Sequence, residues 1–179
     1  MKKTLSTFLA ILIVLSVMPL SMFSVSAATN VVPSGAKQFN GHTYYVFKSK
    51  VSWSKAKAYC ESKGGHLATI TSAKENNFIY NLMQKLKVDD VYIGGTKDSN
   101  GSWKWITGEK FKYTNWDYGE PSSYSDRNRL EMYKGNEWGA WTDKWDGTMY
   151  SNLGYVCEWD MTKTKASGVR LAKTSETVY

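Results

Sequence analysis

The stretch YGEPSSYSDRNRLEMY, from Tyr118 to Tyr133, gathers side chains that could hold a metal ion. Glu120 stands directly before a proline, and three serines, an aspartate and two arginines follow within ten residues. Carboxylates and hydroxyls are oxygen ligands of the kind that Ca²⁺ requires, roughly six to eight at a time. These residues pose the question of whether the segment holds a calcium ion and, through it, a sugar.

The first residues have the pattern of an export signal. Lys2 and Lys3 precede an unbroken apolar run at Phe8–Leu15, and small residues suited to cleavage follow at Ser24–Ala28. A membrane anchor is the alternative, but the run is far shorter than the roughly 20 residues that a membrane span requires. We therefore predict a signal peptide over residues 1–28, a secreted, extracellular protein and no membrane span.

The charge balance is basic, with a formal net charge of +7. The basic residues are spread along the chain, and the nearest approach to a cluster is Lys48, Lys50, Lys55 and Lys57. Such a group is typical of a solvated helix face. Because the chain is predicted to be exported, we expect no nucleic-acid partner.

The chain contains two cysteines, Cys60 and Cys157. In an oxidising compartment, an even number of cysteines favours one disulfide over two buried free thiols or a metal pair. A bridge closing a loop of nearly 100 residues would stabilise the fold by up to roughly 4 to 5 kcal/mol on the chain-entropy model.

A hairpin and two helices are predicted ahead of the opening stretch. Asn40-Gly41 lies between apolar residues, as in a type I′ turn. Ser52 is a candidate N-cap for a helix that ends at Gly64-Gly65, and Ser72 with Glu75 has the capping-box pattern for a second. The predicted apolar stripes are Trp53, Ala56, Tyr59 and Cys60 in the first helix, and Phe78, Ile79, Leu82, Met83 and Leu86 in the second.

Strands and turns are predicted after Lys87. Six segments have the composition of strands and their connections. They are DVYIGGTKD, WKWI, the alternating KFKYTNW, RLEMYK, EWGAWTDKW and LGYVCEWD. Residues 117–128 show no periodicity and form a long surface loop, which in compact domains is often functional. Helices ahead of an antiparallel strand set indicate an α+β fold. We predict one domain at 38–160, with a short leader at 29–37 and a polar, basic tail at 161–179.

Several spaced motifs together resemble a known family. The motifs follow the order found in the C-type lectin-like domain family. They are SWSKAKAYCESKGGHLATITSAKEN (Ser52–Asn76), YIGG, WKWITGEKFKYTNW, GEPS and GYVCEW. The resemblance covers roughly Phe39 to Asp160. It implies a double-loop α+β fold with two helices and small antiparallel sheets, in which the long loop carries the ligand site. It also implies a Cys60–Cys157 bridge, whereas the second, long-loop disulfide of many relatives is absent here.

The resemblance also implies a calcium site on the long loop. Sugar-binding relatives hold Ca²⁺ with a Glu-Pro-Asn triplet, a following glutamate and a Trp-Asn-Asp motif. Here Glu120 and Pro121 match, with the proline expected to be cis, and Ser122 replaces the asparagine. A hydroxyl is a weaker calcium ligand than an amide carbonyl, so the triplet is only partly retained.

The remaining calcium positions are also altered. Arg127 stands where the following glutamate is expected, and an arginine would repel a cation, while the neighbouring Asp126 is a possible replacement. In the last motif Trp141 and Asp143 match and Thr142 replaces the asparagine, with Trp145-Asp146 as a second alignment. Glu120 and Asp143 are the two strong metal ligands that remain.

Aromatic residues near the loop have two possible uses. Five aromatic residues could pack beneath the loop: Trp116, Tyr118, Trp138, Trp141 and Trp145. If one of them is exposed, its ring could stack on a sugar ring. Packing is the expected role for any one of them.

We therefore expect a non-catalytic binding module that recognises glycan through its long loop. Ca²⁺ is the candidate cofactor, and glycan binding without calcium, through aromatic and polar loop groups, is the alternative that the altered ligand positions leave open. The candidate ligand-binding residues are Glu120, Ser122, Asp126, Thr142 and Asp143. A glycosidase pair made by Glu120 and Asp143 is the enzymatic alternative, but the resemblance argues against it. His42 and His66 are the only histidines, and His66 is expected to be structural because no acid or cysteine lies at metal-ligand spacing. The alternative to glycan is calcium-independent recognition of a cell-surface protein, as in adhesion.

Overall fold

The structure is a computed structural model that describes residues 31–135, 139–146 and 152–161. The predicted signal peptide, almost all of the tail and Trp138 lie outside these residues. The described helices are α1 (Trp53–Ser62) and α2 (Ala73–Leu86). Neither has the length and apolar content needed to cross a membrane.

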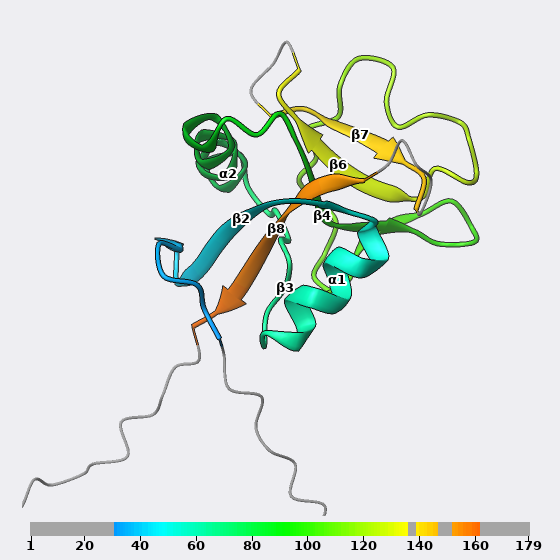
Figure 1. The fold of residues 1–179 in the computed structure, drawn as a ribbon. Coiled ribbons are helices and arrows are strands. Elements are labelled where there is room, and N and C mark those ends of the chain that lie inside the picture. The colour runs from blue at the N-terminus through cyan, green and yellow to red at the C-terminus, as the bar shows by residue number, and fades with distance from the viewer. Residues whose placement is uncertain (1–30, 136–138, 147–151, 162–179) are drawn as a thin grey trace, which may run out of the picture.

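The strands form one branched sheet built around the last of them (Figure 1). The main path runs β1-β2-β8-β4-β6-β7, with β3 beside β8 and β5 beside β4. All pairs are antiparallel except β4 with β8, which is parallel. The fold is α+β as predicted, although the strands join in one mixed sheet instead of separate antiparallel ones. The bounds are β1 (Lys37–Phe39), β2 (His42–Val51), β3 (His66–Leu67), β4 (Asp90–Lys97), β5 (Trp103–Trp105), β6 (Arg129–Tyr133), β7 (Trp141–Lys144) and β8 (Leu153–Asp160).

The predicted turns and helix caps are confirmed. Asn40 and Gly41 both have positive φ, at 48° and 85°, and join β1 to β2. Ser52 caps α1 by accepting from the Lys55 amide, and Ser72 caps α2 by accepting from the Glu75 amide. The reciprocal half of the predicted capping box is absent, because the Glu75 carboxylate accepts from the Thr71 amide at 2.8 Å.

The two helices pack on opposite faces of the sheet, because successive strand residues point to opposite sides. Ile79 and Met83 of α2 share one buried cluster with Val156 of β8. Trp53, Ala56 and Cys60 of α1 share the other with Tyr155, Cys157 and Trp159. Tyr59, predicted to lie on the same buried stripe, is 39% exposed. Leu86, predicted for the stripe of α2, is likewise exposed at the end of that helix.

The predicted bridge between Cys60 and Cys157 is confirmed, joining α1 to β8 across 97 residues of sequence. Both cysteines are fully buried.

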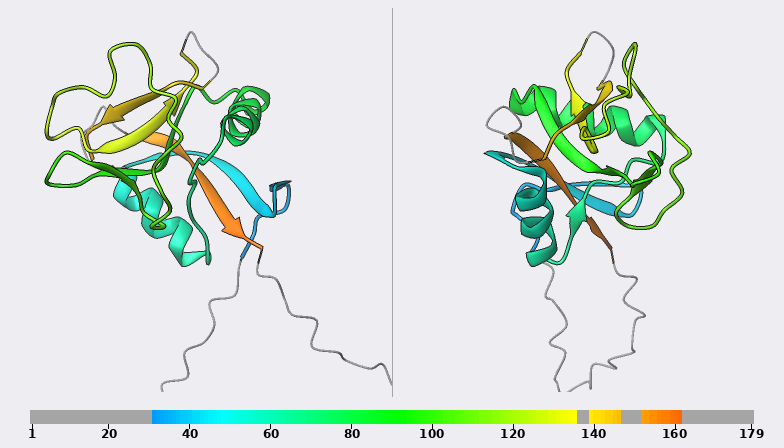
Figure 2. Two further views of the ribbon diagram at one scale, coloured as in Figure 1. Left: turned by 180° about the vertical axis from the view of Figure 1, so that it is seen from behind. Right: turned by 90° about the vertical axis from the view of Figure 1, so that its right-hand side faces the viewer.

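The segment KFKYTNW was predicted as a strand, and this prediction is wrong. Residues 110–115 belong to no strand. The alternating rings are instead partly buried by packing around Trp141, with Phe111, Tyr113 and Trp116 centred 6.3, 5.6 and 6.1 Å from it. The long loop at residues 117–128 lies away from the start of β1 and the end of β8, as the front view in Figure 1 and the back view in Figure 2 show.

Candidate ligand-binding site

The long loop is fastened to β7 by main-chain hydrogen bonds. The Asp117 amide donates to the Trp141 carbonyl at 2.9 Å, and the Trp141 amide donates to the Asn115 carbonyl at 2.7 Å. The Asn115 side chain donates to the Gly139 carbonyl at 3.0 Å. These contacts, together with the rings around Trp141, hold a loop that has no disulfide of its own.

Three of the predicted site residues come together where the loop crosses β7. The Glu120–Pro121 peptide is cis, as expected. The Ser122 amide donates to Glu120 Oε2 at 3.0 Å, and the Ser122 hydroxyl donates to Asp143 Oδ2 at 3.0 Å. Asp143 is fully buried. Ser122 therefore links the two retained carboxylates.

The other predicted site residues do not join this group. In the described part of the chain, neither Asp126, which is exposed, nor Thr142 makes a hydrogen bond to Glu120, Ser122 or Asp143. Asp146, the second possible ligand in sequence, is also engaged elsewhere. It accepts from the Ser54 amide at 3.2 Å and from Arg129 Nε at 3.4 Å.

Two cations stand beside Asp143. Lys97 Nζ lies 3.8 Å from Asp143 Oδ2 and donates to the Tyr124 carbonyl at 2.8 Å. Arg127 Nη1 lies 4.0 Å from Asp143 Oδ1, and its guanidinium covers the Trp145 ring at 4.1 Å. Lys97 is nearly buried, with 9% of its side chain exposed. The last residue of β4 thus supplies a positive charge to a carboxylate of β7.

The calcium that the family implies does not fit these residues. An ion held by Glu120 and Asp143 would meet the ammonium of Lys97 and the guanidinium of Arg127, and like charges in a poorly solvated site repel strongly. The Ser122 hydroxyl donates its hydrogen bond to Asp143. The oxygen atoms that Glu120 and Asp143 could still offer an ion are fewer than the roughly six ligands that Ca²⁺ needs. Lysine and arginine supply the positive charge at Asp143 instead.

Burial raises the pKa of the Asp143 carboxyl, and the charge of Glu120 raises it further. The hydrogen bond from Ser122 and the charge of Lys97 act in the opposite direction. Asp143 Oδ1 is buried, and no described residue forms a hydrogen bond to it. Lys97 and Arg127 are therefore what make an ionised Asp143 tolerable at this position.

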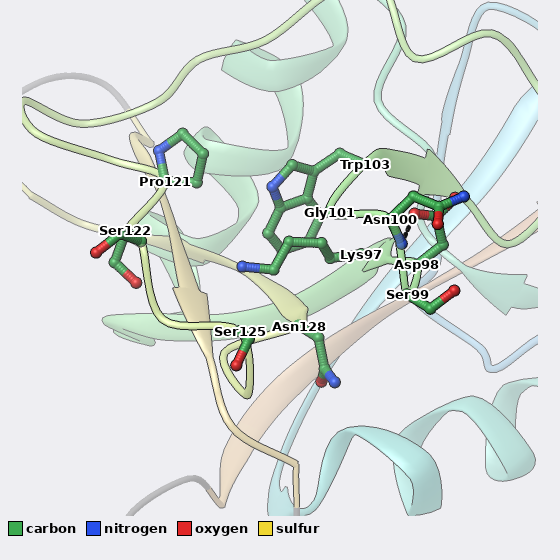
Figure 3. Close-up of a pocket in the computed structure, with 11 residues that line it drawn as sticks. Lys97, Asp98, Ser99, Asn100, Gly101, Trp103, Pro121, Ser122, Ser125 and Asn128 are labelled. Carbon is green, nitrogen blue, oxygen red and sulfur yellow. Dashed lines mark hydrogen bonds between the residues drawn. The ribbon is translucent and has the colours of Figure 1, made fainter.

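A cavity of about 610 Å³ opens between the loop and the β4–β5 turn (Figure 3). This volume lies within the range of roughly 300 to 1,000 Å³ typical of small-ligand sites. Trp103 and Lys97 lie in its centre, Pro121 and Ser122 on one side, and Asp98 to Asn100 on the other (Figure 3). Its lining is Lys97, Asp98, Ser99, Asn100, Gly101, Trp103, Pro121, Ser122, Ser123, Ser125 and Asn128.

The lining combines hydroxyl and amide groups with one aromatic ring. Within the part of the chain that the structure describes, the buried Trp103 Nε1 has no hydrogen-bond partner. Asp98 is committed to its turn, where hydrogen bonding from the Ser102 amide lowers the pKa of its carboxyl. The approach of the Asn100-Gly101 turn to the long loop could not be predicted from the sequence, because no local pattern records it.

The aromatic residues near the loop divide between packing and exposure. Trp141 is fully buried and Trp116 packs against it. Trp145 lies under Arg127. Tyr118 is fully exposed and Tyr124 is 59% exposed, so these two tyrosines are the aromatic side chains that the described loop offers to a partner.

A second buried carboxylate, Glu131 in β6, lies close to this region. It is 2% exposed, and its Oε2 lies 3.2 Å from Lys144 Nζ. Burial raises the pKa of Glu131 to about 7, against the lowering effect of Lys144. The folded chain therefore keeps the Glu131 proton at pH values where the unfolded chain has lost it.

Glu131→Gln is expected to change how stability depends on pH. The unfolded carboxyl ionises near 4.5, so the contribution of Glu131 is fully present below that pH and is lost as pH rises through about 7. Near pH 8 the variant is expected to be about 1 to 3 kcal/mol more stable than wild type. Urea unfolding across this pH range measures the difference. Glu61→Gln, at an exposed position, is the control, and parallel pH profiles for wild type and Glu131→Gln would contradict the prediction.

Comparison with known proteins agrees with this architecture. Residues 49–159 match the family model described as Lectin C-type domain. C-type lectin domain family 4 member F of Rattus norvegicus is 33% identical over 140 residues, which are 73% of this chain but 24% of the relative. The chain thus spans about a quarter of that relative's length.

Two solved structures have similar folds and sequence identities to this chain of a quarter or slightly more. The carbohydrate-recognition domain of cow CD23, determined in the presence of a GlcNAc2Man3 oligosaccharide, is 27% identical with a TM-score of 0.61, covering 72% of this chain and 95% of that one. A calcium-independent type II antifreeze protein is 25% identical with a TM-score of 0.64, covering 73% and 95%.

Proposed function

Because the chain belongs to the C-type lectin domain family, we propose that it is a secreted module that binds carbohydrate through its long loop without requiring calcium. The observation that carries this proposal is the position of Lys97 beside Asp143. A cation of the chain itself neutralises the carboxylate that a calcium ion would need. The loop can therefore hold its shape without a metal.

The cavity beside Lys97 supplies groups that suit a sugar. Ser122, Ser125, Asn100 and Asn128 offer hydroxyls and amides that can both donate to and accept from sugar hydroxyls. Trp103 offers an apolar ring and a buried indole N–H. We assign direct contact to Ser122, and positioning roles to Glu120 and Asp143, which hold Ser122 from two sides. Asp126 lies on the exposed rim, and we assign no ligand contact to Thr142.

The relatives support each half of the proposal. The cow CD23 domain was determined with an oligosaccharide present, so a fold of this kind has been studied with a sugar ligand. The type II antifreeze protein is described as calcium-independent, so the fold does not depend on the ion in every case.

A glycan array probed with millimolar Ca²⁺ and again with chelator tests the proposal. We expect the same glycans to be bound in both conditions, and no rise in Tm with Ca²⁺, because a bound ion would stabilise the folded state by mass action. Ser122→Ala is expected to weaken binding roughly fivefold to tenfold, as expected for one lost hydrogen bond of about 1 kcal/mol. Ser49→Ala, at an exposed position of β2, is the matched control.

Each outcome has a distinct meaning. Binding that disappears with chelator, or a clear rise in Tm with Ca²⁺, would overturn the calcium-independent part. Failure to bind any glycan in either condition would overturn the carbohydrate part and favour recognition of a cell-surface protein. The exposed Tyr118 and Tyr124 are the observation behind that second candidate, since tyrosine is enriched in protein interfaces.

A further inference from the structure

Four side chains that can bind metals converge on one face of the sheet, at the end opposite the long loop. Glu158 and Asp160 lie two residues apart on β8 and therefore point to the same face. On one side, β2 places His42 opposite Asp160, and on the other, β3 places His66 opposite Glu158. Both histidines of the chain thus flank the same pair of carboxylates. We call these four residues the β8 histidine cluster.

The distances within the cluster are short. His42 Nδ1 lies 2.8 Å from Glu158 Oε1 and 2.9 Å from Asp160 Oδ1. His66 Nε2 lies 3.7 Å from Asp160 Oδ1. Tetrahedral bonds of the zinc type, roughly 2.0 to 2.2 Å long, set neighbouring ligand atoms roughly 3.3 to 3.6 Å apart. The measured separations lie on both sides of that range, so small side-chain movements would bring these atoms to it.

His66 is held in the state that a metal ligand needs. Its Nδ1 lies 3.0 Å from the Leu67 carbonyl, and because a carbonyl only accepts, Nδ1 carries the proton of that hydrogen bond. In the neutral ring the lone pair is then on Nε2, which is buried and has no hydrogen-bond partner among the described residues. A backbone carbonyl that fixes the tautomer in this way is the usual support of a metal-binding histidine.

The two carboxylates differ in exposure. Glu158 is almost fully buried, and its Oε2 accepts from the Thr69 amide at 2.8 Å. Asp160 is 68% exposed in its side chain and His42 is 37% exposed. The cluster therefore has one fixed carboxylate at its base and an open side through which an ion can enter.

We propose that the β8 histidine cluster binds a divalent transition-metal ion of the zinc class. His42, Glu158 and Asp160 are the first three ligands, and His66 is the fourth, through Nε2. Imidazole nitrogen with carboxylate oxygen suits Zn²⁺ and its neighbours, whereas Ca²⁺ takes oxygen ligands. This site is separate from the proposed carbohydrate site, and an ordinary ion-pair network between the histidines and the acids is the alternative.

Zinc titration of the mature chain, carried out without an added histidine tag, tests the proposal. Calorimetry near pH 7.5 is expected to show one Zn²⁺ bound per chain. Zn²⁺ at about 100 times its Kd is expected to raise Tm by roughly 5 to 10 °C. Co²⁺ is expected to give visible absorption bands of a four-coordinate site.

Three variants and one control locate the ion. His42→Gln, Asp160→Asn and His66→Gln are each expected to weaken Zn²⁺ binding at least roughly tenfold, while Asp89→Asn, at an exposed acid elsewhere, is expected to bind like wild type. His42 and Asp160 are partly exposed, so their variants should fold, and circular dichroism checks this. The absence of binding and of a Tm shift in wild type would leave only the ion-pair network and overturn the proposal. Equal affinity in His42→Gln and Asp160→Asn would overturn it as well, and equal affinity in His66→Gln would overturn the fourth ligand.

Discussion

Replacing Cys60 and Cys157 with alanine is expected to lower the free energy of unfolding by about 3 to 5 kcal/mol. The bridge closes 97 residues of sequence, so its loss returns a large amount of chain entropy to the unfolded state. Both sulfurs also leave a fully buried cluster between α1 and β8. Denaturant unfolding of wild type and the double variant measures the loss.

Reduction of the wild-type chain is the control for this prediction. The free energy of unfolding of wild type in a thiol reductant should resemble that of the double variant. Reduction removes the same covalent constraint while both cysteine side chains stay in place. If oxidised and reduced wild type unfold at the same denaturant concentration, the bridge contributes nothing and the prediction is wrong.

Trp141→Ala is expected to cost about 3 to 5 kcal/mol, the range found for buried aromatic residues. Trp141 is fully buried, and its ring meets those of Trp105, Phe111, Tyr113 and Trp116. Its indole N–H donates to Asn76 Oδ1 at 2.8 Å, which ties β7 to α2. One side chain thus connects the core to the segment that carries the candidate site.

The effect of Trp141→Ala is expected to extend to the loop. Residues 110–117 are kept in place by these rings and by main-chain hydrogen bonds to residue 141. They belong to none of the described strands. Amide hydrogen exchange in this segment should accelerate more than in β2 or β8, and sugar binding should weaken. Trp141→Phe, which keeps an aromatic ring, is expected to show a smaller version of both effects. Unchanged exchange in residues 110–117 of Trp141→Ala would contradict this account.

The features that could be predicted from the sequence are those decided by neighbouring residues. The caps at Ser52 and Ser72 and the Asn40-Gly41 turn depend on side chains within a few positions of one another. The KFKYTNW segment misled because alternating burial is the usual sign of a strand. Here the same alternation is produced by rings that enter the core from an irregular chain.

The candidate site was only partly predictable for a related reason. Glu120, Ser122 and Asp143 are brought together as their motifs suggested, and Arg127, expected to repel a cation at this site, lies beside Asp143. Lys97 was missed, because its approach to Asp143 depends on β6 lying between β4 and β7 in the sheet. The β8 histidine cluster was missed similarly, since His66 meets Asp160 only after β3 has paired with β8.

The place of β8 in the sheet also bears on the order in which the domain can form. Residues 153–160 pair with β2, β3 and β4, and they carry the second cysteine of the bridge. A chain emerging from the ribosome therefore holds the hairpin, both helices and the β4–β7 strands before the strand that unites them exists. Cooperative folding has to wait until nearly the whole domain has been synthesised, and until then the two halves of the sheet present unpaired edges.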